Sequence, residues 1–218
     1  MKEPKNIGSI EFKAILPPAL EDELILLINS WFPNKYYKLE SGMTKTTIVF
    51  ATEDYVYKIP HNGIYVPLCE KFDDIPTKMY FSKLKENACE KERWFYLRVP
   101  DYLKKFFLSI DKYEMKGSHI SLYKQEKVSI LAENMPEMPV SDTLLNLLEF
   151  NISTYWLNRA VAKYGFEDTK DFILFMNDNL DVAKDLCNSN LGMTKECKPV
   201  VVDYSGFYSY VDEKKNSA

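Results

Sequence analysis

The sequence predicts an α+β fold in which a sheet-rich first part is followed by a mainly helical second part. Apolar residues recur every three or four positions in residues 20–31, whereas the period changes to two from Tyr36 onward. Beyond a linker that contains Pro136 and Pro139, the helical period returns. With 218 residues, of which 46% are hydrophobic, the chain is long enough for one substantial core or for two small lobes that share one.

Composition and charge exclude several classes of protein. The 13 Phe, 15 Tyr and 3 Trp carry far more apolar surface than a disordered chain does. The net charge of -4 excludes a broad electrostatic surface for nucleic acid. No apolar run approaches the roughly 20 residues of a membrane span, and the first residues lack the apolar core of a signal peptide. We therefore expect a cytoplasmic protein that binds neither membranes nor nucleic acids in general.

Cysteine and histidine are too sparse for the common metal or nucleophile chemistries. The four cysteines show no CxxC spacing and are expected to be reduced and structural, and the two histidines, His61 and His119, lie far apart in the sequence. Carboxylate, amide and lysine side chains are left to carry any catalysis.

The elements expected along the chain alternate between helical and extended periods. Before the linker they are helix 20–31, strands 36–40, 46–51 and 55–59, a polar irregular stretch 61–76, helix 78–99, and strands 106–110 and 120–124. After the linker, 132–141, they are helices 142–151, 154–163 and 169–178, a polar segment 185–190, strand 191–193 and the apolar run 200–202.

The end of the last apolar run is the most informative position. Three valines predict a buried strand, and Asp203 follows them directly. A carboxylate at the mouth of a core is costly without a cationic partner, and Mg²⁺ binds through one or two carboxylates together with substrate phosphates. Asn190 begins the preceding strand, so a hairpin would bring its amide oxygen beside Asp203. Asp185, on the loop before it, would be exposed to substrate.

The spacing of these residues resembles the catalytic loop and metal motif of protein kinases and kinase-like phosphotransferases. Asp185-x₄-Asn190 is followed by Asp203-Tyr-Ser-Gly, which begins 13 positions after Asn190, and upstream Tyr55-Val-Tyr-Lys58-Ile resembles the lysine-bearing third strand of that family. The resemblance implies a two-lobed fold. A five-stranded antiparallel N-lobe sheet with one αC-type helix would occupy residues 35–126 and a truncated, mainly helical C-lobe residues 127–218, after a helical extension, 1–34.

The resemblance also implies a role for each site residue. Lys58 would contact the α- and β-phosphates of ATP and be positioned by Glu90, with Glu86 and Glu92 as competing positions on the same helix. Asn190 and Asp203 would hold Mg²⁺, or Mn²⁺ as the alternative metal. Asp185 would orient the acceptor hydroxyl and accept its proton.

Three further groups complete the set that the resemblance implies. Lys184 would add positive charge near the γ-phosphate, and Gln125 would begin the hinge. Gly42 and Thr44 would lie on the phosphate-binding loop, where a single glycine stands in place of the family's three, so that Thr and Lys side chains would assist.

Other departures point to a reduced kinase. Ala183-Lys184 replaces the His-Arg that precedes the catalytic Asp, and only 12 residues follow Gly206. The chain in this respect resembles kinases encoded by bacteriophages and bacterial effectors, which would act in a host cytoplasm. The favoured function is an ATP-dependent protein serine/threonine kinase. A small-molecule kinase and a nucleotide-binding pseudokinase that binds a partner protein remain as alternatives, and the sequence predicts no oligomeric state.

Overall fold

The computed structural model describes residues 18–41, 44–61, 65–72, 75–83, 87–114, 121–179, 186 and 188–204. These residues form a mixed fold with a five-stranded antiparallel sheet and several helices, which confirms the α+β class predicted from the sequence. The chain divides into two compact units, residues 1–89 with 112–124 and residues 90–111 with 125–218.

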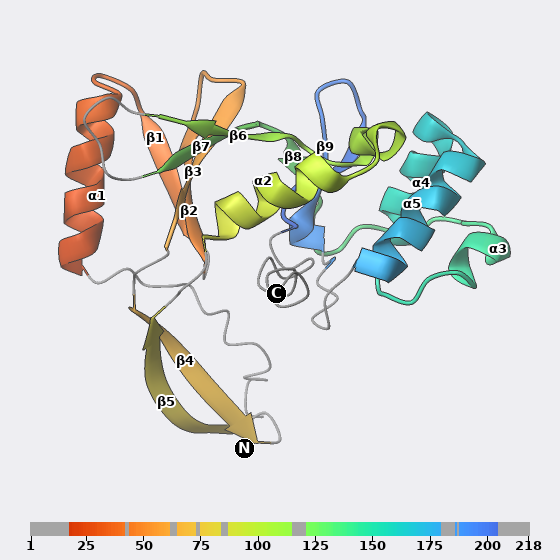
Figure 1. Cartoon of the computed structure of the whole chain (residues 1–218), viewed down its shortest axis with the longest axis horizontal. Helices are drawn as coiled ribbons and strands as arrows, with labels where there is room; N and C mark the ends of the chain where they lie inside the picture. Colours follow the sequence, from red (N-terminus) through yellow and green to blue (C-terminus); the bar gives the residue numbers. More distant parts are fainter. Residues whose placement is uncertain are drawn as a thin grey trace, which may run out of the picture. The chain divides into compact units, whose positions relative to one another are not determined.

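The first unit is built on the five-stranded sheet, whose strand order is β1-β2-β3-β7-β6 (Figure 1). Its strands are β1 (Tyr37–Ser41), β2 (Lys45–Phe50), β3 (Tyr55–Pro60), β6 (Ile110–Tyr113) and β7 (Leu122–Glu126). Helix α1 (Pro18–Trp31) begins at a proline, whose missing N–H costs nothing in the first turn. Its Leu24 and Ile28 pack with Ile48 and Phe50 of β2 in one apolar cluster. The helix therefore covers one face of the sheet.

A two-stranded hairpin replaces the irregular stretch and the first part of the long helix expected from the sequence. Strands β4 (Tyr65–Phe72) and β5 (Ile75–Lys83) pair antiparallel, and helix α2 spans only Ala88–Arg98. The expectation of a helix from residue 78 was therefore wrong. Prolines at positions 67 and 76 argue against central strands, but both strands of a two-stranded sheet are edge strands, where proline is tolerated.

The second unit has a core rich in aromatic side chains. Its helical elements are η1 (Asp101–Phe106), α3 (Asp142–Leu145), α4 (Thr154–Tyr164), α5 (Phe166–Asn179) and η2 (Asn188–Asn190). Helices α4 and α5 lie side by side (Figure 1) and are joined at Gly165, whose φ of 93° favours glycine. Phe106 stacks on Phe172 of α5 with 4.6 Å between the ring centroids. Phe106 and Phe172 are both fully buried in this core.

Two other sequence predictions need correction in this unit. Residues 106–110 were expected to form one strand, but Phe106 ends η1 and strand β6 begins only at Ile110. The carbonyl of Pro100 accepts hydrogen bonds from the N–H groups of Leu103 and Lys104, so the proline starts a helical turn as well as ending α2. The helix expected at 142–151 is shorter, because α3 ends at Leu145.

A small three-stranded sheet of order β10-β9-β8 joins one strand that precedes helices α3 to α5 in the chain to the predicted strand pair, which follows them. Its strands are β8 (Ser129–Ile130), β9 (Leu191–Met193) and β10 (Pro199–Val201).

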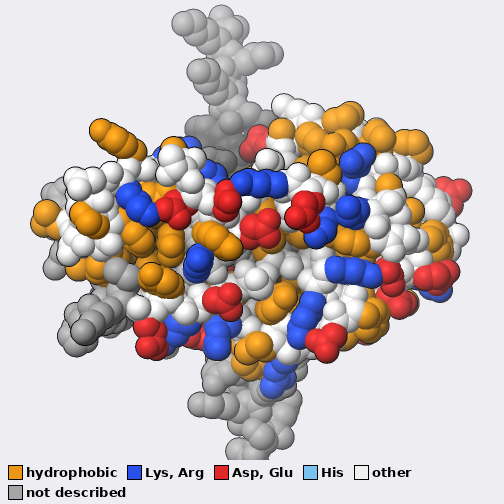
Figure 2. Space-filling model, turned by 90° about the horizontal axis from the view of Figure 1, so that it is seen from above, with side chains coloured by type: hydrophobic (Ala, Val, Ile, Leu, Met, Phe, Trp, Pro, Cys, Tyr) orange, Lys and Arg blue, Asp and Glu red, His pale blue; other side chains and the backbone are white. Residues whose placement is uncertain are grey.

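In the part of the chain that the structure describes, no helix is long and apolar enough to cross a membrane. On the face shown in Figure 2, Lys and Arg side chains are interspersed with Asp and Glu.

Candidate functional site

The strand pair β9–β10 brings Asn190 next to the residue that precedes Asp203. The antiparallel register joins Val201 to Leu191, and beyond it the N–H of Val202 donates to the carbonyl of Asn190 at 2.8 Å. The hairpin expected between these positions is therefore present. It holds the backbones of Asn190 and Val202, the residue before Asp203, side by side at the end of the strand pair.

Asp203 lies between two buried anchors. Val201 on one side and Tyr204 on the other are fully buried, whereas Asp203 itself is partly exposed. The Tyr204 hydroxyl donates to the carbonyl of Leu108. Burial raises the pKa of Tyr204 well above its ordinary value, and the nearby charge of Glu92 raises it further. The raised pKa keeps the Tyr204 hydroxyl protonated at neutral pH. Its hydrogen bond to the Leu108 carbonyl then holds the chain beside Asp203 in position.

The donor set at this position suits a hard divalent cation. Asp203 supplies carboxylate oxygens and Asn190 an amide oxygen, which are ligand types that Mg²⁺ accepts when phosphates and waters complete its shell. Among the described residues no cluster of three or more His, Cys, Asp or Glu side chains could hold a metal ion by itself.

Gln125 reaches the same segment from strand β7. It is 2% exposed, and its Nε2 donates a long hydrogen bond of 3.4 Å to the carbonyl of Val202. Its Oε1 is buried, and no residue in the described ranges donates a hydrogen bond to it. Gln125 therefore contacts the backbone beside Asp203, and its Oε1 accepts no hydrogen bond from the described residues.

Lys58 lies in the sheet of the first unit and is 4% exposed. On the adjacent strand, Lys45, the lysine of the expected phosphate-binding loop, is 6% exposed. The period-two alternation of strand β2 places Lys45 on the face opposite to Ile48. Thr44 precedes this strand, and its carbonyl accepts a hydrogen bond from the N–H of His61 at 2.8 Å.

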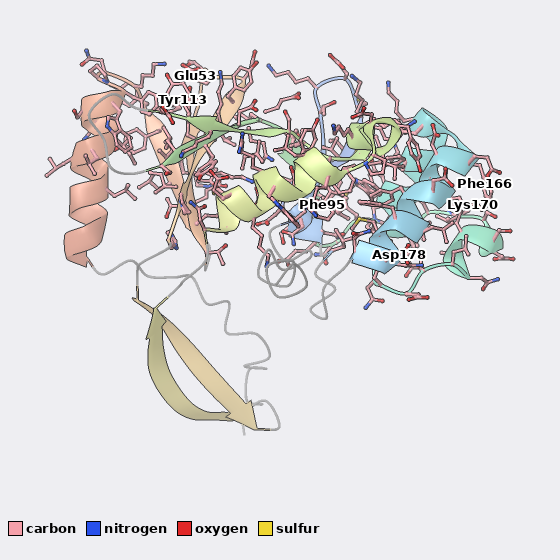
Figure 3. The ribbon with its side chains drawn as sticks, in the orientation of Figure 1. Glu53, Phe95, Tyr113, Phe166, Lys170 and Asp178 are labelled. Carbon is pink, nitrogen blue, oxygen red and sulfur yellow. The ribbon has the colours of Figure 1, made fainter. Side chains whose placement is uncertain are left out.

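Two acids of helix α2 differ sharply in their surroundings. The side chain of Glu90 is 39% exposed and lies 3.6 Å from the guanidinium of Arg93, whereas Glu92 is fully buried. Glu92 shares its face of the helix with Cys89 and Phe95, three residues away in each direction. Phe95 projects from α2 (Figure 3) and its ring centroid lies 5.6 Å from that of Tyr204. The buried acid of α2 is thus the competing position, Glu92, rather than the expected Glu90.

The structure locates part of the predicted set. Asn190, Asp203, Gln125 and Glu90 belong to the second unit, and Thr44 and Lys58 belong to the first. The predicted catalytic Asp185 and Lys184 lie outside the described residues, as does Gly42. Their roles stay predictions.

No model of a known protein family matches the chain, and no curated protein matches it either.

Proposed function

We propose that this protein is an ATP- and Mg²⁺-dependent phosphotransferase with a reduced, two-lobed kinase-like fold, and that it acts on serine or threonine hydroxyls of proteins. The observation that carries the proposal is the hydrogen bond between the Val202 N–H and the Asn190 carbonyl, which lies at the end of a buried strand and one residue before Asp203. Buried Lys58 on the central sheet supports the proposal independently.

Each residue then has a role that its chemistry permits. Lys58 holds the α- and β-phosphates, and an acid of α2 positions it, either the predicted Glu90 or the buried Glu92. Asp185 orients the acceptor hydroxyl and accepts its proton. Lys184 adds positive charge near the transferred group. Phosphoryl transfer depends mainly on positioning and electrostatic stabilisation, and these groups supply both.

The nucleotide and the ion complete the proposed site. When bound through Asn190 and Asp203, Mg²⁺ supplies charge neutralisation to the phosphates. Gln125 and the loop that contains Gly42 and Thr44 flank the nucleotide in this proposal. Binding of Mg·ATP should raise the melting temperature, because a ligand of the folded state stabilises that state.

The decisive experiment is incubation with γ-labelled ATP and Mg²⁺, with the protein alone and with a cell lysate. We expect labelled protein bands. The variant Asp185→Asn should lower labelling by about 10²–10⁴-fold, the usual contribution of a general base, while the affinity for ATP changes little. The matched control is Asp178→Asn, an exposed acid at the end of α5, which should label as the wild type does.

The other outcomes separate the alternatives. Labelled small molecules without labelled protein would assign a small-molecule kinase. Wild-type protein that binds Mg·ATP and transfers no phosphate would be a nucleotide-binding pseudokinase. A protein whose melting temperature is unchanged by Mg·ATP would refute the proposal as a whole.

A further inference from the structure

The turn η2, which ends at Asn190, is held at its first residue by a side chain. The Nδ2 of Asn188 donates hydrogen bonds to the carbonyls of Ala132 and Glu133 at 3.0 and 3.1 Å. An asparagine amide has two N–H groups, so each of the two carbonyls can receive its own hydrogen. Asn188 therefore fastens η2 to the start of the linker, 55 and 56 residues earlier in the sequence.

The other end of η2 is held by backbone hydrogen bonds. The carbonyl of Asn190 accepts from the N–H of Val202 at 2.8 Å, and the carbonyl of Leu191 accepts from the N–H of Leu131 at 2.9 Å. Leu191 also begins β9, the central strand of the small sheet. The backbone is thus fixed where the chain leaves the turn.

A 3₁₀ turn of three residues does not set its own orientation. It has few backbone hydrogen bonds, and their geometry is poorer than in an α-helix, so its orientation depends on contacts with the rest of the chain. Leu186 is 2% exposed in the core and brings the chain close to the turn. A backbone fixed only at Leu186 and at Asn190 could still rotate between these two points. The side chain of Asn188 supplies the contact that prevents this rotation.

Asn188 and Asn190 project from different sides of the turn. A 3₁₀ helix has three residues per turn, so side chains two residues apart leave its axis about 120° apart. Because Asn188 points to the linker, its two hydrogen bonds also determine the direction in which Asn190 projects. Loss of these bonds would change that direction and leave the chemistry of Asn190 intact.

We infer that Asn188 is a positioning residue, which sets the direction of the Asn190 amide by fastening η2 to the linker. That this amide binds Mg²⁺ rests on the proposed function. Mg²⁺ requires a nearly ideal octahedral shell of oxygens, whereas Ca²⁺ accepts a larger and more flexible shell. A change in the direction of Asn190 should therefore weaken the binding of Mg²⁺ more than that of Ca²⁺.

The first measurement needs neither metal nor nucleotide. Amide hydrogen exchange of the full chain, followed by NMR, reports on the hydrogen bond from the Val202 N–H to the Asn190 carbonyl. Asn188→Ala should accelerate the exchange of this amide by about 5- to 30-fold, the factor that corresponds to the loss of one or two hydrogen bonds. Asn188→Gln keeps the two N–H donors and should give a smaller acceleration.

The second measurement is the affinity for ATP with each metal, obtained by calorimetric titration in Mg²⁺ and in Ca²⁺. Asn188→Ala should weaken the binding of Mg·ATP by about 10- to 100-fold, the usual effect of removing a residue that orients a metal ligand. The binding of Ca·ATP should weaken by a smaller factor. Asn188→Gln should recover part of the affinity for Mg·ATP. A purely structural role of Asn188 would not change the ratio of the two affinities.

The matched control is Asn158→Ala. The Nδ2 of Asn158, on α4, donates to the carbonyl of Pro139 at 2.7 Å, so it fastens the linker in the same way at a place without a proposed ligand. Its removal should lower the melting temperature. The exchange of the Val202 amide and both affinities should stay within about twofold of the wild type, because distant sites contribute independently. Circular dichroism of each variant establishes that the fold is retained.

The possible results separate this inference from the proposed function. If Asn188→Ala leaves the exchange of Val202 unchanged, or weakens Mg·ATP and Ca·ATP by the same factor, the inference is overturned while the proposed function stands. The same holds if Asn158→Ala accelerates this exchange equally. If Asn188→Ala accelerates the exchange but the wild type binds no Mg·ATP, the positioning of Asn190 stands and the proposed function fails. Unchanged exchange together with no binding of Mg·ATP by the wild type overturns both.

Discussion

Tyr204→Phe removes one hydroxyl group from the buried residue that follows Asp203. The phenylalanine ring would keep the contacts with Phe95 and Phe107, whose centroids each lie 5.6 Å from that of Tyr204. The hydrogen bond to the Leu108 carbonyl would be lost, and Leu108 is 4% exposed. A typical hydrogen bond contributes about 1 kcal/mol, and an unsatisfied buried carbonyl costs about 1–3 kcal/mol. We therefore expect the free energy of unfolding to fall by about 2 kcal/mol at neutral pH.

The effect should depend on pH in a defined direction. Burial raises the pKa of Tyr204 in the folded protein, whereas an unfolded tyrosine titrates near pH 10. The stability contributed by the protonated hydroxyl is therefore complete below about pH 10 and is lost as the pH rises toward the folded pKa. Tyr204→Phe has no such group to ionise. The stability difference between the two proteins should narrow above about pH 10.

Urea unfolding followed by far-ultraviolet circular dichroism, at about pH 7 and about pH 10.5, measures both effects. In a thermal melt, the loss corresponds to about 4–8 °C for a chain of this size. The control is Tyr164→Phe, whose partly buried hydroxyl donates to the carbonyls of Lys105 and Pro199 at 2.9 and 3.0 Å. Water can replace that donor more easily, so the loss should be smaller. A loss below about 0.5 kcal/mol for Tyr204→Phe, or a difference that is the same at both pH values, would refute the reasoning.

Three further predictions concern the small sheet, β7 and α2. Gly192→Ala should destabilise the protein by about 1–3 kcal/mol, because the added Cβ would lie 2.8 Å from Cγ2 of Val128; an unchanged melting temperature would contradict the close packing. Gln125→Leu should change the free energy of unfolding by less than about 1 kcal/mol, since it removes one long hydrogen bond and one unsatisfied acceptor. A larger loss of stability would mean that the hydrogen bond from Gln125 Nε2 to the Val202 carbonyl is stronger than its length of 3.4 Å indicates. Glu92→Gln should lower the melting temperature more than Glu90→Gln, because only Glu92 is fully buried. Equal changes in melting temperature would mean that the burial of Glu92 does not determine its contribution to stability.

Regular periodicity made several elements predictable from the sequence. Helix α1, strands β2, β3 and β9, and helices α4 and α5 lie within a few residues of their expected positions, because each has a repeating apolar pattern. The hairpin of β4 and β5 was missed because its prolines oppose a strand assignment in a sheet interior, and the sequence does not reveal that, within the described part of the chain, these strands pair only with each other. The end of the helix expected at residue 99 is correct to one residue, but the sequence does not reveal that Pro100 also starts η1.

The sequence predicts the part of the candidate site that is formed by residues close in the sequence. It predicts less well which of several possible side chains is buried in the folded protein. The approach of Asn190 to Val202 follows from a short hairpin, which the run of valines and the preceding strand indicate. The choice between Glu90 and Glu92 depends on which face of α2 is covered. Tertiary packing decides this, and a short helix whose apolar pattern is weak does not reveal it.

Along β2 the side chains alternate between two faces, with Ile48 on one and Lys45 on the other. This alternation also favours the correct pairing register of the strand. A shift of one residue between β2 and its neighbours would exchange the two faces, turning Lys45 toward α1 and Ile48 toward the opposite face. Such a register slip would bury an ammonium group in an apolar cluster and remove the isoleucine from it. The register of β2 therefore depends on the α1 cluster, so substitutions in that cluster should loosen the strand pairing as well as the packing of the helix.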